Sequence, residues 1–141
     1  MLAPNSSSNY QRGRLVPKIL IVEDDMAIRE AFSIVLSSNP NYQVVTAENG
    51  QVALHLCQQD TFDLILLDIM MPVMDGPTFL KEYIARFDDD PTKIIIMSNL
   101  SSGSELSMAQ DFGVSRLVLK SSLTPFELHS LVKTVLHDSP K

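Results

Sequence analysis

Five short apolar runs, separated by segments with helical periodicity, constrain the fold of this chain more than any other feature. Most of these runs are apolar at nearly every position, which is typical of strands covered on both faces in a parallel sheet. Strands alternating with helices predict an α/β fold, a doubly wound five-stranded parallel sheet with five helices. The predicted strands are Lys18 to Val22, Gln43 to Thr46, Asp63 to Leu67, Lys93 to Met97 and Arg116 to Leu119.

The helix ends are also visible in the sequence. The first helix must stop before Asn39–Pro40, because a residue that precedes proline is pushed out of the α region. The fourth, near Ser104 to Phe112, has a thin apolar stripe, so we expect it to be the most mobile. The last begins at a capping box, with Thr124 as N-cap, Pro125 at the first helical position and Glu127 at the third.

The length of 141 residues suits one domain, which we expect over residues 18–137. Residues 1–17 are rich in Ser, Asn and Pro and are predicted to form a flexible lead-in, with a short tail at 138–141. Since so little follows the last helix, we expect output through another protein.

Charge and composition exclude several classes of function. The formal charge of −6 opposes binding to nucleic acid or anionic lipid, and no apolar run is long enough to span a bilayer. A lone cysteine, Cys57, cannot form an intramolecular disulfide. We therefore expect a cytoplasmic protein with neither a nucleic-acid nor a membrane partner.

Polar side chains follow four of the predicted strands, at the carboxyl edge where doubly wound sheets bind ligands. Carboxylates that converge there repel one another unless a cation lies among them, and all-oxygen ligation suits Mg²⁺ or Mn²⁺. A hydroxyl and an ammonium would in addition neutralise a phosphoryl group on one carboxylate. The residues are Glu23, Asp24, Asp25, Asp68, Ser98 and Lys120.

Four segments together resemble the receiver domain of two-component response regulators. The likeness is to the single-domain type, similar to chemotaxis regulators. They are VEDDMAIRE at Val22 to Glu30, LLDIMMPVMDG at Leu66 to Gly76, IIIMSN at Ile94 to Asn99 and VLK at Val118 to Lys120. The resemblance covers about residues 18–137 and implies a flavodoxin-like sheet with strand order 2-1-3-4-5.

The resemblance implies a phosphoacceptor role for Asp68, with Lys120 contacting the phosphoryl group and Ser98 acting as the switch hydroxyl. The phosphate would come from a phosphohistidine on a sensor histidine kinase or a histidine phosphotransfer domain. The phosphorylated form would present a changed surface to a downstream effector protein. This places the chain in bacterial phosphorelay signalling, as a phosphoprotein and not an enzyme in its own right.

The resemblance also implies a set of ligands for Mg²⁺ or Mn²⁺. Asp24 and Asp68 would bind the ion directly, together with the main-chain carbonyl of Met70, and Glu23 would act through water. Asp25 is then left to cap the following helix.

Three switch positions depart from the family pattern. Leu117 stands where the family usually has Tyr or Phe, Asn99 replaces a small residue, and Ser121 replaces a proline that follows a cis peptide. We predict a trans or strained Lys120–Ser121 bond, because a cis bond to a non-proline residue costs about 3 to 4 kcal/mol. Since Met70 and Leu100 are apolar where fast-hydrolysing relatives often have polar groups, we also predict slow self-dephosphorylation.

Three other functions remain as alternatives. A phosphorylation-independent pseudo-receiver, acting as a protein-binding module, is compatible with the departures at Leu117, Asn99 and Ser121. An aspartyl phosphohydrolase usually needs a second Asp two residues after its nucleophile, where this chain has Met70. A flavin or nucleotide carrier needs a glycine-rich phosphate loop, and here the first loop is acidic.

Overall fold

The computed structural model describes residues 16–87, 91–99, 107 and 110–137. They form a single parallel sheet of five strands in the order β3-β2-β4-β5-β6. In chain order this is 2-1-3-4-5, the flavodoxin-like order that the resemblance to receiver domains implies. The strands are β2 (Lys18–Val22), β3 (Gln43–Ala47), β4 (Leu64–Asp68), β5 (Lys93–Ser98) and β6 (Arg116–Leu119).

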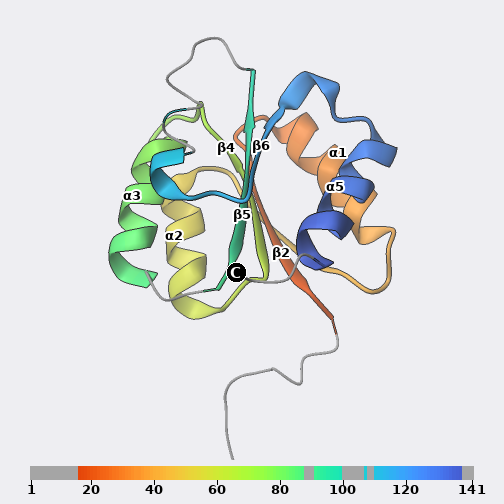
Figure 1. Ribbon diagram of the computed structural model, residues 1–141, viewed down its shortest axis with the longest axis horizontal. Coiled ribbons are helices and arrows are strands. Elements are labelled where there is room, and N and C mark those ends of the chain that lie inside the picture. Colours follow the sequence, from red (N-terminus) through yellow and green to blue (C-terminus); the bar gives the residue numbers. More distant parts are fainter. Residues whose placement is uncertain (1–15, 88–90, 100–106, 108–109, 138–141) are drawn as a thin grey trace, which may run out of the picture.

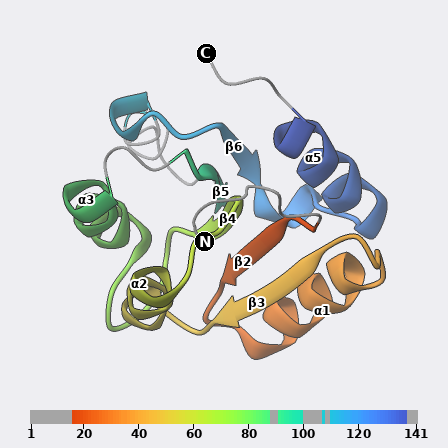
Figure 2. The ribbon, with the colours of Figure 1, turned by 90° about the horizontal axis from the view of Figure 1, so that it is seen from below.

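Helices cover both faces of the sheet. Figure 1 shows α2 and α3 on one side and α1 and α5 on the other, and Figure 2 shows the same two layers from below. Their bounds are α1 (Met26–Ser37), α2 (Gly50–Gln59), α3 (Gly76–Phe87) and α5 (Pro125–His137), with a short 3-10 turn, η1 (Lys120–Ser122), after β6. Most of the fourth predicted helix lies outside the described residues. Within it the structure describes residues 107 and 110–112, and these are helical.

The core has two layers because successive strand side chains point to opposite faces. In β4, Ile65 and Leu67 pack with residues of α2 and α3, while Leu64 and Leu66 pack with residues of α1 and α5. All of β4 is buried, and its first four residues, Leu64–Leu67, supply apolar side chains to both faces. This explains why the strand reads as a continuous hydrophobic run.

The predicted helix boundaries are confirmed at both caps. The side chain of Asp25 accepts from the amide of Ile28 and begins α1. At α5, the Glu127 amide donates to Thr124 Oγ1 at 3.2 Å, and the Thr124 amide donates to Glu127 Oε1 at 3.2 Å. This reciprocal pair is the predicted capping box.

Two strand boundaries extend beyond the prediction and matter for the site. Asp68 is the last residue of β4, and Ser98 is the last of β5, whereas both were expected to follow their strands. The register pairs Asp68 with Met97, the residue before Ser98, so Asp68 and Ser98 lie at the same edge of the sheet on neighbouring strands. Both residues are buried, with 4% and 3% of their surface exposed.

Candidate phosphoacceptor site

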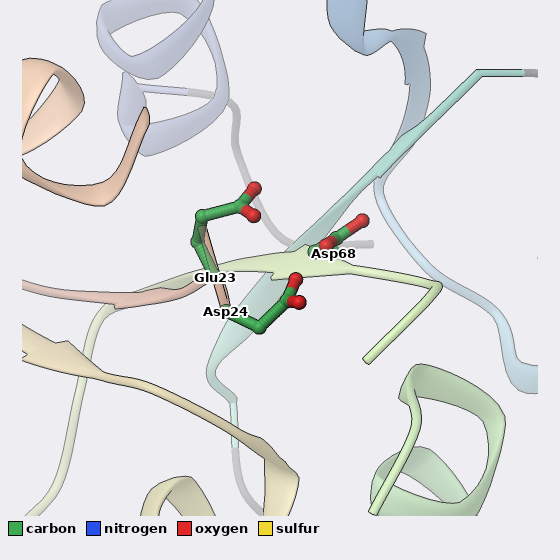
Figure 3. A group of neighbouring side chains, drawn as sticks. All are labelled: Glu23, Asp24 and Asp68. Carbon is green, nitrogen blue, oxygen red and sulfur yellow. The ribbon is translucent and has the colours of Figure 1, made fainter. Parts of the chain in front are cut away.

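Three carboxylates meet at the carboxyl ends of β2 and β4. Glu23 and Asp24 follow β2 directly, and one oxygen from each of Glu23, Asp24 and Asp68 lies within 4.8 Å of the others. Figure 3 shows their side chains arranged around a common space. Glu23 is fully buried and Asp24 is exposed, so this space opens to solvent on the Asp24 side.

Lys120 supplies the cation that faces these acids. It opens η1 directly after β6, and its Nζ lies 2.7 Å from Glu23 Oε1 and 3.2 Å from Asp68 Oδ2. The Glu23 contact is an ion pair without the alignment of a hydrogen bond. The Lys120–Ser121 bond is trans, as predicted, and Lys120 still reaches Asp68.

The crowding of charge is visible in the pKa values of this group. Burial and, next, repulsion by Glu23 raise the pKa of Asp68 to about 7, although Lys120 acts in the opposite direction. Burial by itself would lower the pKa of Lys120, but its pairing with Glu23 and Asp68 outweighs burial and raises that pKa. The ionised form of Asp68 is therefore destabilised when no cation besides Lys120 faces it.

The remaining positions singled out from the sequence surround this centre. Ser98 ends β5 next to β4, and Asn99, the residue after it, is exposed. Leu117 lies in β6 and packs, half-buried, against the core layer of α2 and α3. Ser121 is exposed in η1. Leu100 lies outside the described residues.

The loop between β4 and α3 forms one wall of the site. Met70 is 74% exposed, and its amide lies 3.4 Å from Asp68 Oδ1. Val73 has a φ of +67°, an uncommon conformation for a β-branched residue, and 77% of its surface is exposed. The loop ends at Gly76, where the backbone passes close to β4. Any other residue would place its Cβ 2.9 Å from the Asp68 carbonyl oxygen, which is too close.

Sequence reasoning missed Arg29. Its Nη1 donates to the main-chain carbonyls of Glu23 at 2.8 Å and Asp24 at 3.3 Å. A signal was present, because Arg29 lies near the N-terminus of α1, where the helix dipole disfavours a cation. An arginine at such a position therefore indicates a specific contact, which here is the pair of hydrogen bonds to the loop.

The donor set fits a hard divalent cation. The clustered side-chain atoms are all carboxylate oxygens, and Glu23 Oε1 is buried without an aligned donor. Oxygen ligands of this kind suit Mg²⁺ or Mn²⁺ and not the softer metals. The cluster therefore is a candidate metal site beside Asp68.

Comparison with known proteins agrees with this geometry. The sequence pattern of the family described as response regulator receiver domain matches residues 19–135. The chain belongs to the response regulator receiver family. In this receiver domain of two-component systems, the acidic group of Glu23, Asp24 and Asp68 fits a phosphoacceptor site.

Solved structures of receivers match most of the chain. The chemotaxis response regulator CheY4 of Vibrio cholerae is 29% identical, with a TM-score of 0.77, over 85% of this chain and 98% of that one. The response regulator TrrA of Thermotoga maritima, solved in complex with Mg²⁺ and BeF, is 31% identical, with a TM-score of 0.72, over 85% and 99% of the two chains.

Curated relatives are longer than this receiver. A probable transcriptional regulator, ycf27, of Guillardia theta is 36% identical over 88% of this chain and 47% of its own length. A protein-glutamate methylesterase/protein-glutamine glutaminase of Rhodospirillum rubrum is 34% identical over 73% of this chain and 28% of its own. The chain thus spans less than half the length of these two relatives.

Among the described residues, no helix combines the length and apolarity needed to cross a membrane.

Proposed function

We propose that Asp68 is the phosphoacceptor of this receiver and takes its phosphoryl group from a phosphohistidine. The observation that carries the proposal is the buried Asp68 carboxylate, which has Lys120 Nζ at 3.2 Å and two more carboxylates clustered beside it. One oxygen of Asp68 attacks phosphorus in line, and the phosphorus–nitrogen bond to the donor imidazole breaks. The electron pair returns to the imidazole nitrogen.

Lys120, Asp68 and Ser98 have separate proposed roles in this transfer. Lys120 offsets negative charge on the transferred group, as an ammonium placed against phosphoryl oxygens does in general. Burial of Asp68 keeps the carboxylate poorly hydrated and therefore more reactive as a nucleophile. Ser98, at the end of the neighbouring strand, is the proposed hydroxyl donor to the phosphorylated product.

A divalent cation completes the proposed site. Asp24, Asp68 and the carbonyl of Met70 would hold Mg²⁺ or Mn²⁺ directly, with Glu23 acting through water. When bound, the ion supplies positive charge for the phosphoryl oxygens. The three clustered carboxylates and the pKa of Asp68, raised to about 7, support a site built to receive positive charge.

The proposed output is a change of binding surface. Ser98 would move toward the new acceptor oxygens and draw its loop inward, which repacks the face near β6 and α5. Leu117, half-buried in β6, can change its rotamer but offers no aromatic ring to a partner. Displacement of the Ser98 loop is therefore the principal signal in this receiver.

The proposed partners are a sensor histidine kinase or histidine phosphotransfer domain, and an effector protein that reads the phosphorylated surface. We propose a cytoplasmic location for this receiver, whose one cysteine, Cys57, is buried and forms no disulfide. The methylesterase and transcriptional activities belong to the named relatives. The receiver itself is proposed as a switch with no enzymatic activity beyond its own phosphorylation and dephosphorylation.

The test is phosphorylation by acetyl phosphate, followed by intact mass against time. Wild-type protein with Mg²⁺ should gain one phosphoryl group, and Asp68→Asn with Mg²⁺ and wild type in EDTA should gain none. Asp111→Asn, at an exposed position, is the matched control and should behave as wild type. If wild type gains no phosphoryl group while Mg²⁺ still binds, the proposal is wrong and a phosphorylation-independent module takes its place.

A further inference from the structure

Arg29 connects the first helix to the loop that carries Glu23 and Asp24 after β2. Its Nη1 lies 2.8 Å from the Glu23 carbonyl oxygen and 3.3 Å from the Asp24 carbonyl oxygen. One guanidinium nitrogen therefore contacts two consecutive peptide groups. The side chain is half-buried, and its own amide is fixed by the first helical bond of α1, to the Asp25 carbonyl at 2.8 Å.

The loop needs such an anchor because its own side chains oppose its conformation. Glu23 and Asp24 both project toward Asp68, and three carboxylates within 4.8 Å repel one another. The other bonds of the loop are weaker restraints on Asp24. The Asp25 amide donates to Glu23 Oε2 at 3.0 Å, and the Glu23 amide donates to the Ala47 carbonyl at 3.1 Å. Neither of these two bonds involves a group of Asp24.

We propose that Arg29 is a positioning residue, whose hydrogen bonds to the Glu23 and Asp24 carbonyls hold the loop in the conformation that binds the divalent cation. This inference rests on the proposed metal site, and extends it to a residue that would not touch the ion. An arginine suits the task because it stays protonated and presents several donors in a fixed plane.

The sign of the effect on metal affinity separates positioning from simple charge. Arg29 is a cation close to a cation site, so removing its charge should tighten metal binding if Coulomb repulsion is all that matters. If Arg29 positions the carboxylates, removing it should weaken binding, because the loop must then be ordered when the ion binds. The two accounts predict opposite changes.

The experiment compares Mg²⁺ and Mn²⁺ affinity by titration calorimetry in wild type, Arg29→Met, Arg29→Lys and Arg86→Met. We expect about five- to tenfold weaker binding in Arg29→Met, from the loss of two hydrogen bonds of ordinary strength. Arg29→Lys keeps the charge without the planar donor group and should fall between. Arg86, exposed on α3 and paired with Glu82 at 3.3 Å, is the control and should bind as wild type.

A second measurement is made without metal. In Arg29→Met the amide of Asp25, which bonds to Glu23 Oε2, should exchange its hydrogen faster than in wild type, while core amides of β4 should not change. Equal or tighter metal binding in Arg29→Met overturns the inference. If Arg29→Met does not fold, Arg29→Lys decides, and wild-type affinity in that variant overturns it.

Failure of the proposed function gives a different result. If wild type binds Mg²⁺, Arg29→Met binds it more weakly, and neither accepts phosphate from acetyl phosphate, then positioning stands and phosphoacceptor function falls. If wild type is phosphorylated and Arg29→Met retains full Mg²⁺ affinity, the function stands and the inference falls. Absence of Mg²⁺ and Mn²⁺ binding in wild type would overturn both the metal site and the inference.

Discussion

Replacing Asp68 with asparagine should make the metal-free protein more stable at neutral and alkaline pH, although the replacement removes the residue on which function depends. In the folded protein, burial and then Glu23 raise the pKa of Asp68 from 3.8 to about 7. When a carboxylate whose pKa is raised by folding ionises, the folded protein loses stability. The asparagine side chain is nearly the same size as that of aspartate and cannot ionise.

The magnitude follows from proton linkage. A shift of roughly three pKa units, at about 1.4 kcal/mol per unit, corresponds to about 4 kcal/mol. Between the unfolded pKa near 4 and the folded pKa of about 7, the folded state binds more protons than the unfolded state, so wild-type stability falls as pH rises. The Asp68→Asn variant escapes this loss, and the difference between the two proteins should reach its full size above about pH 8.

The assay is urea unfolding followed by circular dichroism, in EDTA and low salt, from pH 4.5 to 8.5. We expect the advantage of Asp68→Asn to grow from below about 1 kcal/mol at the acidic end to about 3 to 5 kcal/mol at the alkaline end. Asp111→Asn, at an exposed position, should show no such pH dependence. A constant difference across pH, or a less stable Asp68→Asn at pH 8.5, would refute the reasoning. Saturating Mg²⁺ should stabilise wild type more than Asp68→Asn and so reduce the difference between the two proteins.

Four further predictions concern the loops and caps. Val73→Gly should raise the unfolding free energy by about 0.5 to 1 kcal/mol in urea titration, since glycine tolerates the φ of +67° at little cost; a lower stability would contradict this. Gly76→Ala should destabilise by about 2 kcal/mol or more, because a Cβ would lie 2.8 Å from Ile69 Cα and 2.9 Å from the Asp68 carbonyl oxygen; a loss near zero would show that the loop adapts. Thr124→Ala should lower the melting temperature through a loss of about 1 kcal/mol at the α5 capping box, and an unchanged melting temperature would refute it. Decay of phosphorylated wild type, followed by intact mass, should take minutes or longer and become faster in Met70→Asn, whose position is 74% exposed beside Asp68; decay in seconds for wild type would be the contrary result.

The sequence predicted the five strands because each carries its own signal, whereas the strand order 2-1-3-4-5 came from the resemblance to the receiver family. Fully buried strands such as β4 are apolar at almost every position, and the capping box of α5 is a local pattern. The carboxyl edge then follows from topology, since parallel strands end on one side. This brought Asp68, Glu23 and Lys120 together in advance, and the ion pairs confirm their proximity.

The details that the sequence did not predict depend on tertiary geometry. Lys120 Nζ lies closer to Glu23 Oε1, at 2.7 Å, than to Asp68 Oδ2, at 3.2 Å, and no local sequence pattern indicates this difference. The positive φ of Val73 arises from closing the β4–α3 loop, and valine itself argues against that conformation. The bonds of Arg29 join its side chain to main-chain carbonyls six and five residues earlier, a spacing that no hydrophobic period marks. The one sequence signal is an arginine near a helix N-terminus.

The most direct test of the central claim is to find which residue carries the phosphoryl group. Protein phosphorylated by acetyl phosphate with Mg²⁺ is reduced with borohydride, which converts an aspartyl phosphate to homoserine, and peptides are then sequenced by mass spectrometry. We predict homoserine at Asp68 alone, with unmodified residues at Asp24 and Asp25. Modification at another residue, or none under conditions in which Mg²⁺ binds, would contradict the assignment of Asp68 as the phosphoacceptor.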